Sequence, residues 1–119
     1  MPLDVVAKPL NSTTIHVRWR PPANRDKNGL IRGYQVHVQE MNREGDLVNE
    51  PLRYDVASEE AEEYNVSGLQ PDTDYSVQVA AVTRKGDGTR SRAVTVKTHG
   101  GGEVYLRYSN FKYYILTFI

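Results

Sequence analysis

The three histidines are the first residues to weigh for chemistry, because an imidazole can ligate a metal ion or act as a general base near neutral pH. They stand far apart, at His16, His37 and His99, and the alternation around the first two places them on strand faces toward solvent. No carboxylate or thiolate stands at ligand spacing beside them. The sequence therefore predicts neither a metal site nor a catalytic base, and we expect no cofactor and no enzymatic activity from this chain.

Cysteine is absent from the 119 residues, which excludes disulfides, thiolate zinc sites, iron–sulfur clusters and cysteine nucleophiles. The chain carries 15 basic and 15 acidic side chains, so its formal net charge is zero. Such a chain has no long-range field to hold nucleic acid or an anionic membrane. We expect no nucleic-acid partner and no membrane insertion, and any recognition by charge must be local.

Two Asn-x-Ser/Thr sequences are candidates for N-glycosylation. Asn11-Ser12-Thr13 falls in a polar turn, and Asn65-Val66-Ser67 falls on a strand from which Asn65 should point outward. Seven Asn residues at this Ser/Thr frequency give roughly one such sequence by chance, so two are weak evidence for the secretory pathway.

Alternation of apolar and polar residues predicts the elements that position these groups. Strands are expected at residues 15–20, 31–39, 52–56, 64–66, 75–81 and 91–98, separated by turn-rich segments. No helical periodicity competes with this pattern. Short strands with frequent turn signals indicate an all-β sandwich of seven strands.

Residues 69–75 read Leu-x-Pro-x-Thr-x-Tyr and predict a corner at which the chain enters a strand. A tyrosine at such a corner buries its ring and bonds its hydroxyl to backbone a few residues upstream. The predicted core consists of Trp19, Tyr34, Val36, Leu69, Tyr75, Val77 and Val79. Trp19, the lone tryptophan, is its expected anchor.

The corner and the tryptophan together resemble a fibronectin type III domain, which implies a seven-stranded immunoglobulin-like β-sandwich over residues 1–98. Four further strings look like the extracellular repeats of LAR-type receptor protein tyrosine phosphatases: Pro9-Leu10-Asn11-Ser12-Thr13 leading into His16-Val17-Arg18-Trp19, Ile31-Arg32-Gly33-Tyr34-Gln35-Val36, Tyr75-Ser76-Val77-Gln78-Val79-Ala80-Ala81, and Lys85-Gly86-Asp87-Gly88-Thr89-Arg90-Ser91. That family carries its phosphatase domains on the cytoplasmic side, and this chain has no cysteine to supply their nucleophile.

The resemblance implies an extracellular protein interaction and spacer module of a cell-adhesion receptor, in a fragment or truncated form of a receptor-type tyrosine phosphatase. Its partners would be protein ligands or neighbouring type III or immunoglobulin domains, outside the plasma membrane. Two alternatives stay open: a type III module of a neural immunoglobulin-superfamily adhesion molecule, or an intracellular structural module of the muscle type. The sequence shows no apolar signal-peptide core and no uncharged run of the ~20 residues that a spanning helix needs, so we expect extracellular work only within a larger protein.

Lys85-Gly86-Asp87 falls in the expected loop between the last two strands. In adhesive type III domains this loop presents Arg-Gly-Asp to integrins, so one interpretation is an integrin-binding loop. The other is a tight turn in which Gly86 and Gly88 adopt positive φ and Asp87 bonds its own backbone. Turn chemistry alone accounts for the same residues, and we favour it.

Six basic residues fall in or beside two loops that are expected to lie at one end of the sandwich: Arg20, Arg25, Lys27, Arg84, Lys85 and Arg90. One interpretation is a patch that makes a weak contact with sulfated glycans or acidic partners. The other is local neutralisation by the acidic residues expected nearby, Glu59, Glu60, Glu62 and Glu63. We favour neutralisation, because charge patches discriminate poorly between functions.

The pattern changes after Thr98, where His99 and three glycines lead into an aromatic segment. We assign residues 99–119 to a glycine hinge and apolar aromatic tail outside the domain. Its last seven residues, 113–119, are uncharged, β-prone and free of proline. Three alternatives follow: an aberrant terminus that truncates a longer receptor, an extra strand that folds back on the sandwich or augments a partner's sheet, or the start of a membrane segment, which the charges at Glu103, Arg107 and Lys112 disfavour.

Overall fold

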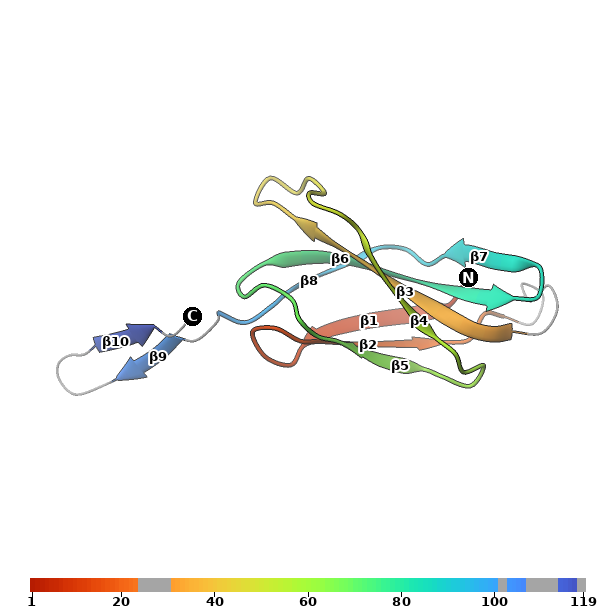
Figure 1. Cartoon of the computed structure of the whole chain (residues 1–119), viewed down its shortest axis with the longest axis horizontal. Helices are drawn as coiled ribbons and strands as arrows, with labels where there is room; N and C mark the ends of the chain where they lie inside the picture. The colour runs from red at the N-terminus through yellow and green to blue at the C-terminus, as the bar shows by residue number, and fades with distance from the viewer. Residues whose placement is uncertain (24–30, 101–102, 107–113, 118–119) are drawn as a thin grey trace.

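The computed structural model describes residues 1–23, 31–100, 103–106 and 114–117, and side chains within the first two of these ranges. Every regular element in them is a β-strand. Two antiparallel sheets pack face to face (Figure 1), as the resemblance implied. The all-β sandwich prediction is confirmed.

One sheet has three strands in the order β1-β2-β5, namely β1 (Leu3–Pro9), β2 (Ile15–Arg20) and β5 (Glu63–Val66). The other has five. Its order is β4-β3-β6-β7, with β8 also paired to β6, and its members are β4 (Leu52–Val56), β3 (Ile31–Met41), β6 (Asp74–Thr83), β7 (Gly86–Arg90) and β8 (Val94–Lys97). The strands at residues 15–20 and 52–56 match their predicted bounds.

The sandwich has eight strands rather than the predicted seven, because its last strand is interrupted. Since β3 occupies one edge of β6, both β7 and β8 share the other edge. At the interruption, two hydrogen bonds of Ser91 take the place of regular strand pairing. Its N–H donates to the Val79 carbonyl at 2.8 Å, and its Oγ accepts from the Val79 N–H at 2.9 Å. The predicted last strand at 91–98 is therefore wrong in its start: pairing begins at Gly86, where the Gly-Asp-Gly sequence had indicated only a turn.

The core lies between the sheets, and all seven residues named for it from the sequence are at most 4% exposed. The Trp19 and Tyr34 ring centroids, one from each sheet, lie 5.2 Å apart. Ile15, Val17 and Val66 join them and are fully buried. Burial of an aromatic pair with its aliphatic neighbours is the main source of stability in a domain without disulfides.

The corner before β6 forms as predicted from its sequence. The Tyr75 hydroxyl oxygen accepts a hydrogen bond from the Gln70 N–H at 2.8 Å, five residues upstream. Gly68 and Asp72 adopt φ of +76° and +50°, which lets the backbone reverse between β5 and β6. A glycine accepts this conformation at little cost, and aspartate is one of the few other residues that adopt it.

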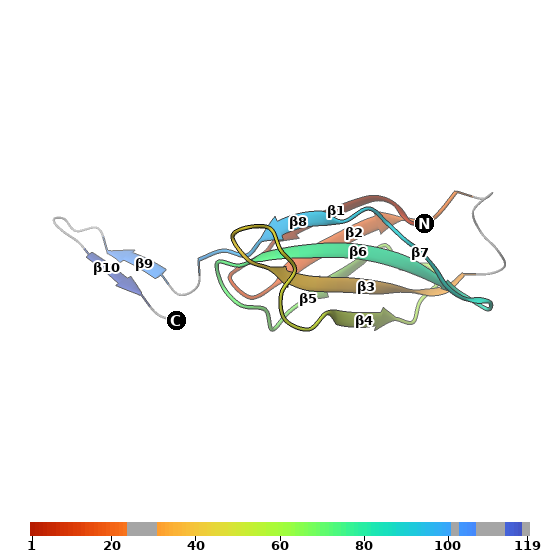
Figure 2. The same cartoon turned by 90° about the horizontal axis from the view of Figure 1, so that it is seen from above.

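The sandwich begins and ends at opposite ends of its long axis, as two perpendicular views show (Figures 1 and 2). Beyond the end of β8, the strands β9 (Glu103–Leu106) and β10 (Tyr114–Thr117) pair antiparallel with each other in a separate two-stranded sheet. The sequence predicted one strand-forming run at 113–119, of which residues 113, 118 and 119 lie outside the described residues. The tail is thus partly a hairpin.

Candidate functional site

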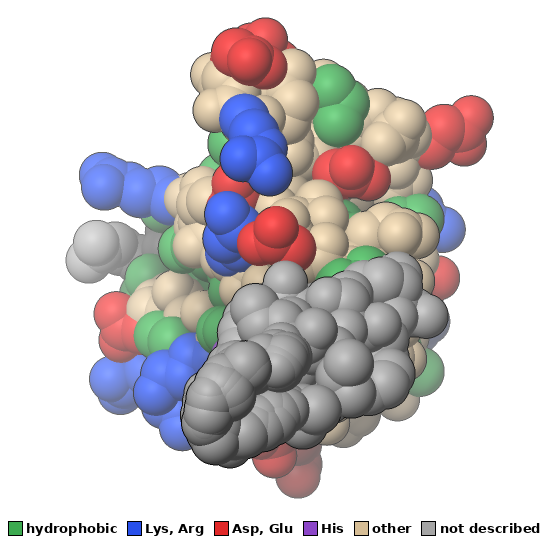
Figure 3. Space-filling view, turned by 90° about the vertical axis from the view of Figure 1, so that its left-hand side faces the viewer, with side chains coloured by type: hydrophobic (Ala, Val, Ile, Leu, Met, Phe, Trp, Pro, Cys, Tyr) green, Lys and Arg blue, Asp and Glu red, His purple; other side chains and the backbone are tan. Residues whose placement is uncertain are grey.

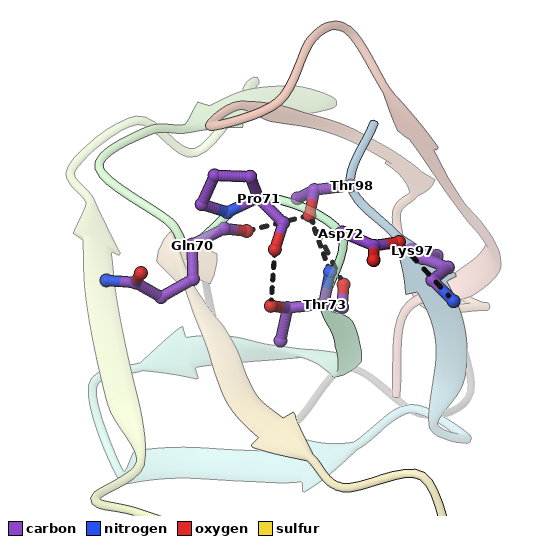
Figure 4. Close-up of polar contacts among 6 residues, drawn as sticks. All are labelled: Gln70, Pro71, Asp72, Thr73, Lys97 and Thr98. Atoms are coloured by element: carbon purple, nitrogen blue, oxygen red, sulfur yellow. Dashed lines mark hydrogen bonds and ion pairs between the residues drawn. The ribbon is translucent and has the colours of Figure 1, made fainter. Parts of the chain in front are cut away.

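Three polar regions of the described structure are candidates for function. They are the chain-exit cluster (Gln70, Pro71, Asp72, Thr73, Lys97 and Thr98; Figure 4), the outer face of the β1-β2-β5 sheet, and the β6–β7 hairpin with its neighbours on β3.

Thr98 is the centre of the chain-exit cluster and is only 3% exposed. Its hydroxyl donates to the Gln70 carbonyl at 2.7 Å and accepts from the Thr73 N–H at 3.0 Å (Figure 4). Its own N–H donates to the Thr73 carbonyl at 3.0 Å. One buried threonine therefore joins the outgoing end of the last strand to the tyrosine corner.

Further backbone contacts hold the outgoing chain beyond Thr98. The His99 carbonyl accepts from the Asp72 N–H at 2.9 Å, and the His99 N–H donates to the Asn11 carbonyl at 3.3 Å. Lys97 Nζ lies 3.6 Å from Asp72 Oδ1, but this half-exposed pair contributes only ~0–1 kcal/mol. Neutral hydrogen bonds, rather than charge, fix the direction in which the chain leaves the sandwich.

His16 organises the outer face of the β1-β2-β5 sheet. Its Nδ1 lies 2.6 Å from Asn65 Oδ1, and its Nε2 lies 3.1 Å from Glu63 Oε1. The antiparallel register places Asn65 directly opposite His16, so the sheet supplies the neighbouring carboxylate that the sequence alone did not show. Among the residues that the structure describes, no three His, Cys, Asp or Glu side chains are grouped to hold a metal ion.

One arginine of the predicted basic patch has an acidic partner other than the expected ones. Arg20 pairs with Asp4 at 3.3 Å instead of with a residue of the 59–63 segment, and Glu63 pairs with His16. Arg25 and Lys27, two members of the predicted basic patch, lie outside the described residues. On the uncovered part of the opposite end that Figure 3 shows, Lys and Arg side chains lie beside Asp and Glu side chains.

The β6–β7 hairpin turns more tightly than the sequence indicated. Gly86 and Asp87 already pair with Thr83 and Val82 in the sheet, so the connection is confined to residues 84 and 85. Gly86 has a φ of +114°, as a turn interpretation requires. Gly88 does not share that conformation; its lack of a side chain instead lets the strand approach, since a Cβ there would lie 3.0 Å from the Ala81 carbonyl oxygen.

Asp87 also belongs to a polar chain that crosses the sheet. Its Oδ1 accepts from Gln35 Nε2 at 3.3 Å, and Gln35 Oε1 lies 3.2 Å from Nε2 of His37. Gln35 is only 6% exposed although it faces outward. Burial, followed by the charges of Arg90 and Arg53, lowers the pKa of His37, and therefore its ring stays neutral near physiological pH.

The comparison with protein families concerns the whole sandwich, since residues 1–97 match the family model of the fibronectin type III domain. The chain belongs to the fibronectin type III family. The tyrosine corner, the buried Trp19 and the two antiparallel sheets are the physical counterpart of that match.

The relatives of this type III domain include receptor phosphatases. The chain is 60% identical over 101 residues to tyrosine-protein phosphatase Lar of Drosophila melanogaster, which covers 84% of this chain and 5% of that protein. It is 46% identical over 99 residues to receptor-type tyrosine-protein phosphatase F of Mus musculus, covering 83% and 5%. The crystal structure of the FN5 domain of Drosophila Lar is 59% identical, with a TM-score of 0.67, and covers 84% of this chain and 96% of that one.

The type III domain is therefore homologous to extracellular repeats of receptor-type tyrosine phosphatases. It is a non-catalytic module, and the relatives are phosphatases through other domains. The chain spans only 5% of the length of these curated relatives. In the part of the chain that the structure describes, no helix is long and apolar enough to cross a membrane.

Proposed function

We propose that this type III domain acts by protein–protein contact, and as a spacer between neighbouring domains, on the extracellular side of a receptor-phosphatase-like adhesion receptor. The observation that carries the proposal is the 60% identity to Lar over 101 residues, which covers 84% of this chain. The wider similarity to adhesion proteins, such as 32% identity over 97 residues to cell adhesion molecule DSCAM of Gallus gallus, supports the same class of function.

The arrangement of the ends supports the spacer role. The chain enters the sandwich at one end and leaves it at the other (Figure 2), which suits a domain strung in a tandem array. Hydrogen bonds with the Gln70 carbonyl, which accepts, and with the Thr73 and Asp72 N–H groups, which donate, hold the outgoing segment at residues 98–99. These contacts fix the direction of the chain only as far as His99, directly before the glycines assigned to the hinge.

The hairpin at Lys85, Gly86 and Asp87 remains a candidate contact for the protein-binding role. It protrudes at the tip of β6 and β7, and all residues of β7 are exposed. The hydrogen bond from Gln35 to Asp87 holds the carboxylate against the sheet, which favours a contact with a flat protein surface over insertion into a metal site. A weak contact of Arg84 and Lys85 with sulfated glycans belongs to the same hypothesis.

Two measurements on the native protein test the proposal. An antibody against residues 1–97 should label intact cells, and a membrane-impermeant biotin reagent should modify the antigen without permeabilisation. Staining only after permeabilisation would refute the extracellular assignment and favour the intracellular structural alternative. Immobilised chain should support attachment of cells, and soluble chain should compete for it. If the domain contributes no contact, attachment will equal that on a blocked surface.

The Asp87→Ala variant examines the hairpin separately. Loss of attachment with an unchanged melting temperature would assign the contact to the hairpin. Unchanged attachment would exclude Lys85-Gly86-Asp87 and move the search to the outer faces of the sheets. Thr89→Ala serves as a matched control, because it alters the same exposed strand without removing a charge.

A further inference from the structure

A shallow groove crosses the outer face of the β4-β3-β6-β7 sheet. The residues that line it include Arg90, Gln78, His37, Gln39, Pro51 and Leu47. It runs from the end of β7, over β6 and β3, to the connection that precedes β4. None of the described residues that line it is acidic. The groove is therefore cationic at the β7 end and apolar at the β4 end.

The apolar end is formed by the connection between β3 and β4, which projects from the sandwich (Figure 1). Asn42 fixes this connection, because its Oδ1 accepts from the Glu44 N–H at 3.0 Å and from the Asp46 N–H at 2.9 Å. Leu47 follows directly and is 56% exposed, the largest value among the exposed large hydrophobic residues of the described chain. A side chain held in place before binding loses little conformational freedom when a partner covers it.

Arg90 supplies the charge at the β7 end. Its Nη1 donates to Gln78 Oε1 at 3.4 Å, a long hydrogen bond to a neutral group. Within the described residues Arg90 forms no ion pair, whereas Arg20 and Arg53 lie 3.3 and 3.5 Å from carboxylate oxygens. A guanidinium has five N–H donors in a planar fork that matches a carboxylate. Most donors of Arg90 are therefore available to a partner.

His37 lines the groove between the two ends. Gln35 donates through its Nε2 to Asp87, so its Oε1 is the atom that accepts from Nε2–H of His37. In the neutral ring this arrangement leaves Nδ1 as an acceptor, and no hydrogen bond of Nδ1 occurs in the part of the chain that the structure describes. The middle of the groove can therefore accept a backbone N–H of an occupant.

We propose that the groove binds a short acidic segment of another protein, an inference that rests on the proposed protein-contact function and names a surface for it. A carboxylate of the segment pairs with Arg90, and an aliphatic side chain packs against Leu47 and Pro51. The groove extends from β7 to the β4 side of the sheet, which is three steps between strands of about 4.8 Å each. An extended chain covers that length in about four residues, and residues four apart face the same side. The occupant therefore carries its acidic and aliphatic side chains four residues apart.

Charge complementarity selects this occupant. A basic segment would approach Arg90 without finding a carboxylate among the lining residues. A wholly apolar segment would cover the guanidinium without pairing it, and burial of an unpaired charge costs free energy. A carboxylate satisfies the fork of Arg90 and leaves the apolar end free for a side chain of its own kind.

The test is an NMR titration of the ¹⁵N-labelled full chain with two capped peptides, Glu-Thr-Ser-Thr-Leu and its reverse Leu-Thr-Ser-Thr-Glu. Matched control peptides carry Gln in place of Glu. We expect at least one acidic peptide to cause saturable shifts at the groove residues, with a dissociation constant on the order of 1 mM. The Gln peptides should bind about tenfold more weakly. No saturable shift, equal affinity for the Gln peptides, or shifts centred outside the groove would overturn the proposal.

Variants locate the contact. Arg90→Gln should weaken binding of the acidic peptide about tenfold, and Leu47→Ser should weaken binding of the acidic and Gln peptides alike. Arg92→Gln is the matched control and should bind like the wild type, because it removes the same charge at an exposed position outside the groove. An equal loss in Arg90→Gln and Arg92→Gln would mean unspecific charge attraction and would refute the assigned groove. Matching melting temperatures establish that each variant stays folded.

The titration does not depend on where the protein resides, so the two proposals fail separately. Cells that show the antigen only after permeabilisation would refute the proposed function while leaving peptide binding in the groove intact. A chain that labels intact cells and supports their attachment, yet gives no saturable shift with either acidic peptide, would refute the groove alone.

Discussion

Replacing Thr98 with valine should destabilise the domain although the two side chains have nearly the same shape. The substitution removes one hydroxyl at a position that is 3% exposed. That hydroxyl accepts from the Thr73 N–H at 3.0 Å and donates to the Gln70 carbonyl at 2.7 Å. Valine therefore leaves one backbone donor and one backbone acceptor without this partner, at two hydrogen bonds that are part-buried.

Each unsatisfied buried group costs ~1–3 kcal/mol; because these two hydrogen bonds are only part-buried, we take about 1–2 kcal/mol for each, so the two together predict a loss of about 2–4 kcal/mol. The total stability of a domain is only ~5–15 kcal/mol. For a domain of this size, 1 kcal/mol corresponds to about 4–8 °C in melting temperature, so even the lower bound predicts a fall of about 8 °C.

Urea unfolding followed by Trp19 fluorescence measures this loss, since Trp19 is the lone tryptophan and is buried. The midpoint should fall while the slope m stays constant, because the surface exposed on unfolding hardly changes. Thr98→Ser is the matched control. It keeps the hydroxyl, loses one methyl group, and should cost about 1 kcal/mol. If Thr98→Val melted within about 2 °C of the wild type, water would be replacing the hydroxyl and the chain-exit cluster would add little stability.

Four further predictions concern the core, a close contact, pH and the tail. Trp19→Ala should cost ~3–5 kcal/mol and nearly unfold the domain; a melt only a few degrees lower would contradict the assigned core. Gly33→Ala should cost ~1–3 kcal/mol in the same assay, because its new Cβ would collide with the last carbonyl of β4; wild-type stability would mean that β4 shifts freely. The pKa of His37 is lowered by burial and nearby arginines, so the unfolded chain binds more protons, and stability should fall as the pH drops below about 6.5; His37→Gln should weaken that dependence, and an identical pH profile would refute it. A chain cut after Gly100 should melt like the full chain, whereas one cut after Thr98 should melt slightly lower because it loses the two backbone bonds of His99; a large loss in both would make the tail part of the fold.

Residue type and period were enough to predict the corner and the core. The sequence from Leu69 to Tyr75 contains an apolar residue for the core, turn-forming residues and a tyrosine hydroxyl at fixed positions. The structure shows the expected hydrogen bond from the backbone to the Tyr75 hydroxyl. Trp19 and Val77 were assigned by alternation, which the two-residue period of a strand makes reliable wherever one face is buried. Local patterns of this kind require no knowledge of which strands are neighbours.

Contacts that depend on strand register were not predictable. His16 meets Glu63 and Asn65 only because β2 pairs with β5 in one register, and a shift by one residue would turn these side chains to the other face. The strand β1 was missed for a related reason. Its register shifts between Leu3 and Val6, and such an irregularity breaks the alternation by which strands are recognised.

The chain-exit cluster shows why a threonine at the end of a strand is hard to interpret from sequence. Threonine is common in strands for its branched shape. Alternation puts Thr98 in phase with the buried Val96 and Thr95 on the exposed face, but it does not reveal which groups the Thr98 hydroxyl bonds. Thr98 faces the loop before β6. Beyond the last paired residues of β8 and β6, its hydroxyl bonds the Thr73 N–H and the Gln70 carbonyl of that loop. Because the same loop is bonded to Tyr75, the strength of the corner and the direction of the outgoing chain are coupled. A substitution at either residue should therefore loosen the outgoing segment at residues 98–99 before it unfolds the sandwich.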